Sequence, residues 1–243
     1  MANEFELDIA SLTAYLEANV DGFKGPLTAE KFAGGQSNPT YLIEAASGKY
    51  ALRRKPPGEL LKSAHAVDRE FRVMQALAST EVPVPKMRVL CDDDSVIGSM
   101  FYLMDFLDGR IMWDAALPEQ TPAERTAIYD AMNKGLADLH NVDIEKAGLS
   151  DYGKPGNYFE RQLSRWTKQY RASETETVPS MEKMMVWLSD NLPEDDGLVC
   201  INHGDFRLDN MMFAHDSSEV LALLDWELST LGHPYADLAY QCM

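Results

Sequence analysis

The feature that most constrains the fold is a pair of short apolar runs near the end of the sequence, each followed at once by polar residues. The first run, at 198–201, leads into HGDFRLDN, which contains Asp205 and Asn210. The second run, at 220–224, ends at Asp225. Because polar residues that follow buried strands gather at the strand ends, we expect these three side chains to meet in one crevice.

Three oxygen donors in one crevice suit phosphoryl transfer. That reaction needs an oriented hydroxyl group and divalent cations that neutralise phosphate charge. Mg²⁺ prefers oxygen ligands, usually one or two carboxylates together with phosphates and water. We expect Asp205 to orient the hydroxyl, and Asn210 and Asp225 to hold the metal. The plainer interpretation is that Asp205 and Asp209 only cap a turn, but the combined spacing favours a site.

The remaining periodicity predicts a mixed α+β chain whose first part is rich in sheet and whose second part is mostly helical. Helical spacing is found at 5–20, 68–77, 121–140, 156–172 and 180–192. Strand-like runs are found at 40–44, 50–53, 87–90 and 100–104, and a small strand pair is expected from 198–201 and 220–224. Ser47 and Gly48 predict a hairpin turn. The pattern changes from strand-like to mostly helical at 105–109, where we place the boundary between the two parts.

Composition excludes several classes of partner. The sequence of 243 residues has 39 acidic and 22 basic side chains, a net charge of −17, which disfavours nucleic acid and anionic membranes. Its start resembles no signal peptide, and no apolar run approaches a membrane span. The three cysteines are far apart in the sequence. We therefore expect a cytoplasmic protein without metal-binding or disulfide-bonded cysteines.

The strings HGDFRLDN, LLDWE and HPYADLAY resemble the aminoglycoside phosphotransferase (APH) family, which has a protein-kinase-like fold. GGQSNPTYLIE, LRRKPPG and SAHAVDREFRV are similar to one subgroup, the kinase-like module of acyl-CoA dehydrogenase fusion proteins and its bacterial relatives. The resemblance covers nearly the whole sequence. It implies a bilobal fold, with a nucleotide-binding N-lobe at 1–107 and a C-lobe at 108–243 that carries the catalytic loop and metal site.

In that family a nucleoside triphosphate, ATP or GTP, lies between the lobes. The resemblance implies that a small-residue loop approaches the phosphates closely and that the backbone of the interlobe hinge binds the purine. The loop residues are Gly35, Gln36, Ser37 and Asn38, and the hinge residues include Asp105 and Leu107.

The resemblance also implies a basic residue on the third strand that pairs with phosphates and with a helix glutamate. Arg53 and Glu70 match these positions. Kinase-like folds usually have lysine there, and arginine binds phosphate as a planar fork, so Lys55 is an alternative cation. We interpret Arg54 as a solvated surface charge.

Three further expectations concern the end of the sequence. Asp237 resembles a family residue that braces the catalytic loop, and His233 replaces an aspartate, so we expect a loop histidine there. The family continues with helices that complete the acceptor pocket. Relative to the family, the C-lobe is therefore expected to be incomplete, either as a fragment or as a shortened member.

The resemblance implies Mg²⁺-dependent transfer of a nucleotide γ-phosphate to a hydroxyl of a small molecule, with a hydroxyacyl-type metabolite favoured. An alternative is a nucleotide-binding, kinase-like module without turnover. A third hypothesis, a metal-dependent hydrolase using His203, Asp205 and His215, lacks a recognisable ligand motif. The acceptor and the oligomeric state remain open.

Overall fold

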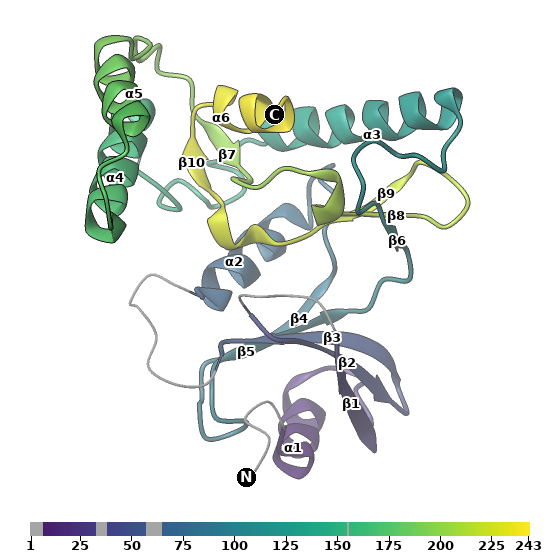
Figure 1. Ribbon diagram of the computed structural model, residues 1–243. Helices are drawn as coiled ribbons and strands as arrows, with labels where there is room; N and C mark the ends of the chain where they lie inside the picture. Colours follow the sequence, from purple (N-terminus) through teal and green to yellow (C-terminus); the bar gives the residue numbers. More distant parts are fainter. Residues whose placement is uncertain (1–6, 33–37, 57–64, 155) are drawn as a thin grey trace.

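The computed structural model describes residues 7–32, 38–56, 65–154 and 156–243. A twisted five-stranded sheet lies at one end, and most helices lie at the other (Figure 1). The sheet is antiparallel throughout, in the order β1-β2-β3-β5-β4. Its strands are β1 (Leu27–Lys31), β2 (Thr40–Ala45), β3 (Gly48–Arg54), β4 (Met87–Cys91) and β5 (Phe101–Asp105).

One face of the sheet is covered by α1 (Ile9–Asn19), the helix nearest the N-terminus in Figure 1. Leu12 and Leu16 of this helix are fully buried with Ile43 and Leu52 of the sheet in one hydrophobic cluster. Each large apolar side chain that becomes buried stabilises this packing by about 1.5–3 kcal/mol, which fixes the helix on this face.

The opposite face of the sheet meets α2 (Val67–Leu77), which also contacts the helical part. Val73, Met74 and Leu77 join a cluster that extends to buried residues such as Ile128 and Phe213. Because α2 packs on both sides, its side chains can link the sheet to the remainder of the molecule.

The helical part also contains two small sheets. Strand β7 (Cys200–Asn202) pairs with β10 (Thr230–Gly232), and β8 (Met211–Phe213) pairs with both β6 (Arg110–Ile111) and β9 (Val220–Leu223). The helices are α3 (Pro122–His140), α4 (Tyr158–Ser173), α5 (Pro179–Asp190) and α6 (Tyr235–Gln241), with two 3₁₀ turns, η1 (Leu208–Asn210) and η2 (Trp226–Leu228).

Most predicted elements are present, but strands β1, β6, β8 and β10 were not predicted and one strand pairing differs. Strand β1 was missed because only Leu27 of its five residues is buried, so it lacks a strong apolar pattern. The predicted pairing of 198–201 with 220–224 is wrong. Each of these strands pairs instead with a short strand that follows a 3₁₀ turn, so β7 and β9 belong to different sheets.

Arg54 is not the solvated surface charge that we predicted. Its side chain is 3% exposed, and its Nε donates to Ser99 Oγ at 3.0 Å. Successive strand residues face opposite sides, so Arg53 points into the interlobe cleft while Arg54 points toward the face covered by α1.

Two other sequence-based expectations can be compared with the described residues. Among them, no helix is both long and apolar enough to cross a membrane. Cys91, Cys200 and Cys242 are free thiols.

Candidate active site

The turn after β7 carries Asp205 and is fixed by a buried carboxylate. Asp237 of α6 is 0% exposed and accepts hydrogen bonds from the backbone N–H groups of His203 (2.7 Å) and Gly204 (2.8 Å). Burial raises the pKa of Asp237, but the bonds from His140 and these two amides outweigh it, so the pKa is lowered. An ionised Asp237 therefore braces the turn, as the resemblance implied.

Gly204 is required by the shape of this turn. Its φ is +86°, and a Cβ atom there would lie 2.7 Å from the backbone oxygen of Leu228. Both the left-handed backbone and the close approach exclude a side chain. The turn is consequently held against the segment that follows Asp225.

His203 connects the turn to the strand that ends at Asp225. Its Nε2 lies 2.8 Å from the backbone oxygen of Leu224, and its Nδ1 accepts from the N–H of Asp205 at 3.3 Å. Burial lowers the pKa of this imidazole, which favours the neutral ring. A neutral ring with its proton on Nε2 satisfies both bonds. The His203 ring therefore fixes the separation between Asp205 and the end of the strand that precedes Asp225.

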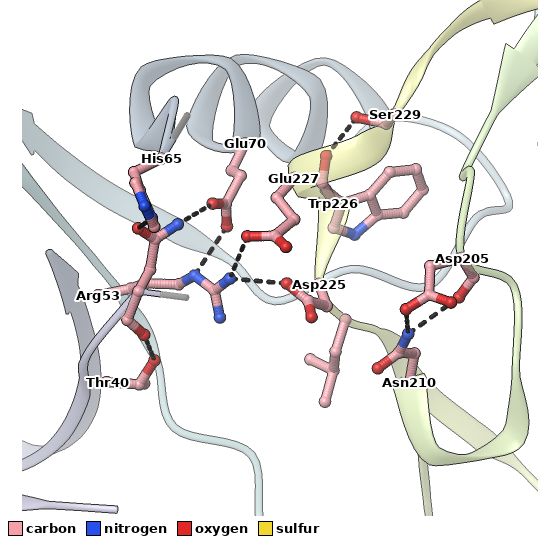
Figure 2. A network of polar contacts seen from close by, with 12 residues as sticks. Thr40, Arg53, His65, Glu70, Asp205, Asn210, Asp225, Trp226, Glu227 and Ser229 are labelled. Carbon is pink, nitrogen blue, oxygen red and sulfur yellow. Dashed lines mark hydrogen bonds and ion pairs between the residues drawn. The ribbon is translucent and has the colours of Figure 1, made fainter. Parts of the chain in front are cut away.

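Asn210 is oriented by Asp205. The Asn210 amide nitrogen donates to Asp205 Oδ2 at 2.8 Å and to the Asp205 backbone oxygen at 2.9 Å (Figure 2). Because both donor bonds are directed to Asp205, the carbonyl oxygen of Asn210 faces away from it. This oxygen is thus available to a cation.

Arg53 lies on the other side of the site, among three carboxylates (Figure 2). Its Nη2 is 2.6 Å from Asp225 Oδ1 and 3.7 Å from Glu227, and its Nε is 2.9 Å from Glu70. Burial lowers the pKa of Arg53, but the carboxylates raise it by more. The guanidinium is therefore a fixed positive charge beside the Asp225 carboxylate.

A cleft of about 520 Å³ connects these groups to the hinge. Asn210, Asp225 and Arg53 line one end, and Asp105 and Leu107 line the other. This arrangement has room for a phosphate chain at the charged end and a flat ring at the apolar end.

The apolar end of the cleft has two aromatic side chains. The rings of Phe32 and Phe106 are stacked at 6.5 Å between centroids, and both line the cleft. Arg88 holds the Asp105 carboxylate at 2.5 and 2.9 Å, and the Asp105 backbone N–H donates to the Lys86 backbone oxygen at 2.9 Å, so both groups are already hydrogen-bonded.

Most predicted site residues come together. Asp205 lies outside the described lining of the cleft but is one hydrogen bond from Asn210, which lines it. Asn38 also lies outside that lining, buried against Glu70. Gly35, Gln36 and Ser37 fall outside the described residues.

The structure separates the two candidate cations. Arg53 points to Asp225 and Glu70, whereas Lys55 lies 3.9 Å from Asp68 at the start of α2. Of the two, only Arg53 lines the described cleft. These positions favour Arg53 as the cation of the site.

Three residues near the site were not assigned from the sequence. Glu227 follows Asp225 in the string LLDWE, which could have indicated it. Phe32 directly follows the missed strand β1, and His65, which contacts Asn38, lies in the string SAHAVDREFRV but was given no role there.

The histidines of the hydrolase hypothesis do not converge. The His203 ring is directed to Leu224, and His215 lies 3.0 Å from Asp108. His233, expected as a loop histidine, is 4% exposed and lies 3.2 Å from Asp196. The hydrolase hypothesis therefore has no geometric support.

The donor set fits Mg²⁺ bound together with a phosphate ligand. Asn210 offers an amide oxygen and Asp225 a carboxylate on the same cleft. Among the described residues, no group of three His, Cys, Asp or Glu side chains could hold a metal ion. Mg²⁺ commonly completes its shell with phosphate oxygens and water, so a two-ligand site is sufficient for it.

Fold and site together define a kinase-like phosphotransferase architecture. The family model "Phosphotransferase enzyme family" (APH) matches residues 28–243, and the chain belongs to that family. A solved structure, described as a putative aminoglycoside phosphotransferase from Ralstonia eutropha, is 53% identical with a TM-score of 0.89 over 98% of this chain and 70% of that one. The predicted α+β, protein-kinase-like fold is confirmed.

Curated relatives include much longer proteins. Acyl-CoA dehydrogenase family member 10 of Mus musculus is 52% identical over 90% of this chain and 20% of its own length. Acyl-CoA dehydrogenase family member 11 of Rattus norvegicus is 47% identical over 98% of this chain and 31% of its own length. The chain thus spans a fifth to a third of these relatives. The predicted similarity to the kinase-like region of such proteins is confirmed.

Proposed function

We propose that the protein transfers the γ-phosphate of ATP or GTP to a hydroxyl group of a small molecule in a Mg²⁺-dependent reaction. One observation carries the proposal. The Asp205–Asn210 pair and the Asp225–Arg53–Glu70 ion pairs lie at one end of a cleft whose other end is a hinge with stacked aromatic rings.

Each residue has a separate role in this proposal. Asp205, held by the turn at Gly204, accepts a hydrogen bond from the acceptor hydroxyl and orients its oxygen for attack. Asn210 and Asp225 hold Mg²⁺, which supplies positive charge to the phosphates. Arg53, fixed by Glu70, contacts the phosphates as a planar cation. Asp105 and Leu107 offer backbone groups to the purine.

The division of the chain is part of the proposal. Residues 1–107 form the N-lobe and 108–243 the C-lobe. Strand β6 and Gly109 lie just beyond this boundary, where a Cβ atom on Gly109 would come within 2.6 Å of Phe213. This close approach packs residue 109 against the C-lobe, which supports placing the boundary before it.

We place the enzyme in the cytoplasm, acting on a hydroxyacyl-type metabolite without nucleic-acid or membrane partners. The acceptor class is supported by the names of the curated relatives at 47–52% identity, which are acyl-CoA dehydrogenase family members. Solved aminoglycoside phosphotransferases of low identity, such as APH(4)-Ia at 15%, share the fold alone.

An acceptor screen tests the proposal. ADP release from Mg-ATP is measured over hydroxy acids, hydroxyacyl-CoAs, choline and aminoglycosides. We expect release with a hydroxyacyl compound, and a decrease in kcat of about 10²–10⁴ in Asp205→Asn with nucleotide affinity retained. Asp143→Asn, an exposed residue paired with Lys146, is the control and keeps full activity.

Two outcomes would contradict this function. Nucleotide binding without release above the Asp205→Asn level with any acceptor would favour a binding module without turnover. Equal activity of Asp205→Asn and wild type would remove Asp205 from the reaction.

A further inference from the structure

A buried polar network lies behind Arg53, away from the cleft. Glu70 is 1% exposed, and two hydrogen-bond donors and the Arg53 cation surround its carboxylate. The Asn38 amide nitrogen donates to Oε1 at 2.9 Å, the Tyr102 hydroxyl donates to Oε2 at 3.0 Å, and Arg53 Nε lies 2.9 Å from Oε2. Glu70 thus reaches Arg53 with one oxygen and Asn38 with the other.

The direction of each hydrogen bond follows from chemistry. A carboxylate only accepts, so the Asn38 amide nitrogen faces Glu70 and its oxygen faces the other way. That oxygen lies 3.0 Å from His65 Nδ1, which must therefore donate. Asn38 is 0% exposed, and its amide accepts a hydrogen bond from His65 and donates one to Glu70; we call this pair of bonds the relay.

Asn38 also joins two segments near Arg53, at the charged end of the cleft. It lies directly before β2, where its backbone oxygen accepts from Thr40 Oγ1 at 3.3 Å. Glu70 is in the first turns of α2. The amide of Asn38 therefore ties the end of the β1–β2 connection to α2.

We propose that Asn38 is a positioning residue that holds Glu70, and through Glu70 the Arg53 guanidinium, at the phosphate end of the cleft. This inference rests on the proposed function and changes the role of Asn38 within it. The sequence resemblance implied that Asn38 approaches the nucleotide itself. Its buried side chain, directed at Glu70 and His65, acts on the nucleotide only through Arg53.

The proposal distinguishes two substitutions. Asn38→Ala leaves one oxygen of a buried carboxylate without its donor at any pH. Asn38→Asp places a second carboxylate beside Glu70, and two such groups share one proton. The other groups facing this pair are His65, Tyr102 and Arg53, with Asp225 and Glu227 beyond the guanidinium. Protonation at low pH restores a donor to Glu70 in this variant.

The experiment measures Mg-ATP affinity at pH 8.0 and pH 5.5, each variant as a ratio to wild type at the same pH. We expect Asn38→Ala to bind about 10-fold more weakly at both pH values. We expect Asn38→Asp to bind at least about 10-fold more weakly at pH 8.0 and to recover most of that loss at pH 5.5. Asn141→Asp, the same change after the end of α3, serves as the control and matches wild type at both pH values.

A measurement without nucleotide separates this inference from the proposed function. In a double-mutant cycle of urea unfolding, Asn38→Ala and Glu70→Ala should be non-additive because each removes the same hydrogen bond. If wild type binds no Mg-ATP, the proposed function fails, and this cycle alone decides whether Asn38 holds Glu70. Additive effects in the cycle would overturn the proposal. Wild-type affinity in both Asn38 variants would also overturn it, as would a loss of affinity in Asn38→Asp that does not change with pH.

Discussion

Asp225 illustrates how one residue meets several demands at once. It has left-handed backbone angles of φ 62° and ψ 61°, which are costly for a non-glycine residue. Its carboxylate is 2.6 Å from Arg53, and the preceding backbone oxygen, of Leu224, is bonded to His203. This placement directs the carboxylate into the cleft beside Asn210.

Replacement of Asp225 tests its assignment as a metal ligand. We expect Asp225→Asn to weaken Mg-nucleotide binding about 10- to 100-fold, because one charged interaction with the metal is lost. Isothermal titration calorimetry with and without Mg²⁺ measures this effect. Nucleotide affinity in the absence of metal should change much less. An equal loss under both conditions would show that Asp225 is not acting through Mg²⁺.

His203 makes a pH dependence testable at the residue scale. Burial lowers the pKa of His203 in the folded state from its usual 6.5. Below about pH 6.5 the His203 ring is therefore protonated more readily in the unfolded chain than in the folded protein. The free energy of unfolding should therefore decrease as pH falls through this range, by up to about 1.4 kcal/mol per pH unit for this group.

Urea unfolding between pH 5.0 and 7.5 measures that slope. We expect His203→Gln to have a smaller dependence on pH than wild type, since the titrating ring is gone. The same slope in both proteins would mean that His203 is protonated equally in the folded and unfolded states.

Elements determine whether these side chains meet. The turn that carries Asp205 follows β7, Asp225 follows β9, and Glu70 is carried by α2, which contacts both parts of the molecule. Arg69 of α2 donates to the Tyr152 backbone oxygen at 2.8 Å, and its guanidinium lies 4.2 Å from the centre of the Tyr152 ring. Helix α2 is thus anchored to the helical part while Glu70 reaches the sheet.

Gly204 tests whether the turn needs its close contact with η2. Gly98 is a matched control, because its φ of +84° is nearly that of Gly204 but a Cβ atom there would meet nothing within 4 Å. Both alanine variants should lose about 1–3 kcal/mol from backbone strain. Gly204→Ala should lose more, together with most activity, because its methyl group collides with Leu228. Equal losses in stability and retained activity would contradict this account.

The sequence predicted the helices and the β2–β3 hairpin well because local apolar spacing and turn residues mark them. It also indicated Asp205, Asn210 and Asp225, which follow apolar strands. It could not predict the burial of Arg54 or the relay through His65, because those depend on partners far apart in the sequence. The strand pairing of β7 and β9 failed for the same reason: short strands have several equivalent partners until tertiary packing selects one.

At the scale of the whole molecule, the cleft joins an end that contains Phe32 and Phe106 to an end that contains Arg53 and Asp225, in a protein of net charge −17. Arg53 offsets part of the acidic field where phosphates would bind. Mg-ATP should therefore bind and stabilise the fold, whereas ATP with EDTA should stabilise it less.

Thermal unfolding measures this linkage. At a Mg-ATP concentration 100 times its Kd, the free energy of unfolding should rise by about 2.7 kcal/mol. The gain should decrease in Arg53→Gln, since the guanidinium no longer contacts the phosphates. An increase that is unaffected by both EDTA and Arg53→Gln would place the nucleotide away from this end of the cleft.

The most direct measurement is a crystal structure with Mg²⁺ and a non-hydrolysable ATP analogue. We expect the metal to be bound by the Asn210 carbonyl oxygen, the Asp225 carboxylate and phosphate oxygens, with Arg53 on the phosphates and Asp205 facing the terminal phosphate. A nucleotide bound outside this cleft, or a metal with neither Asn210 nor Asp225 among its ligands, would contradict the central claim.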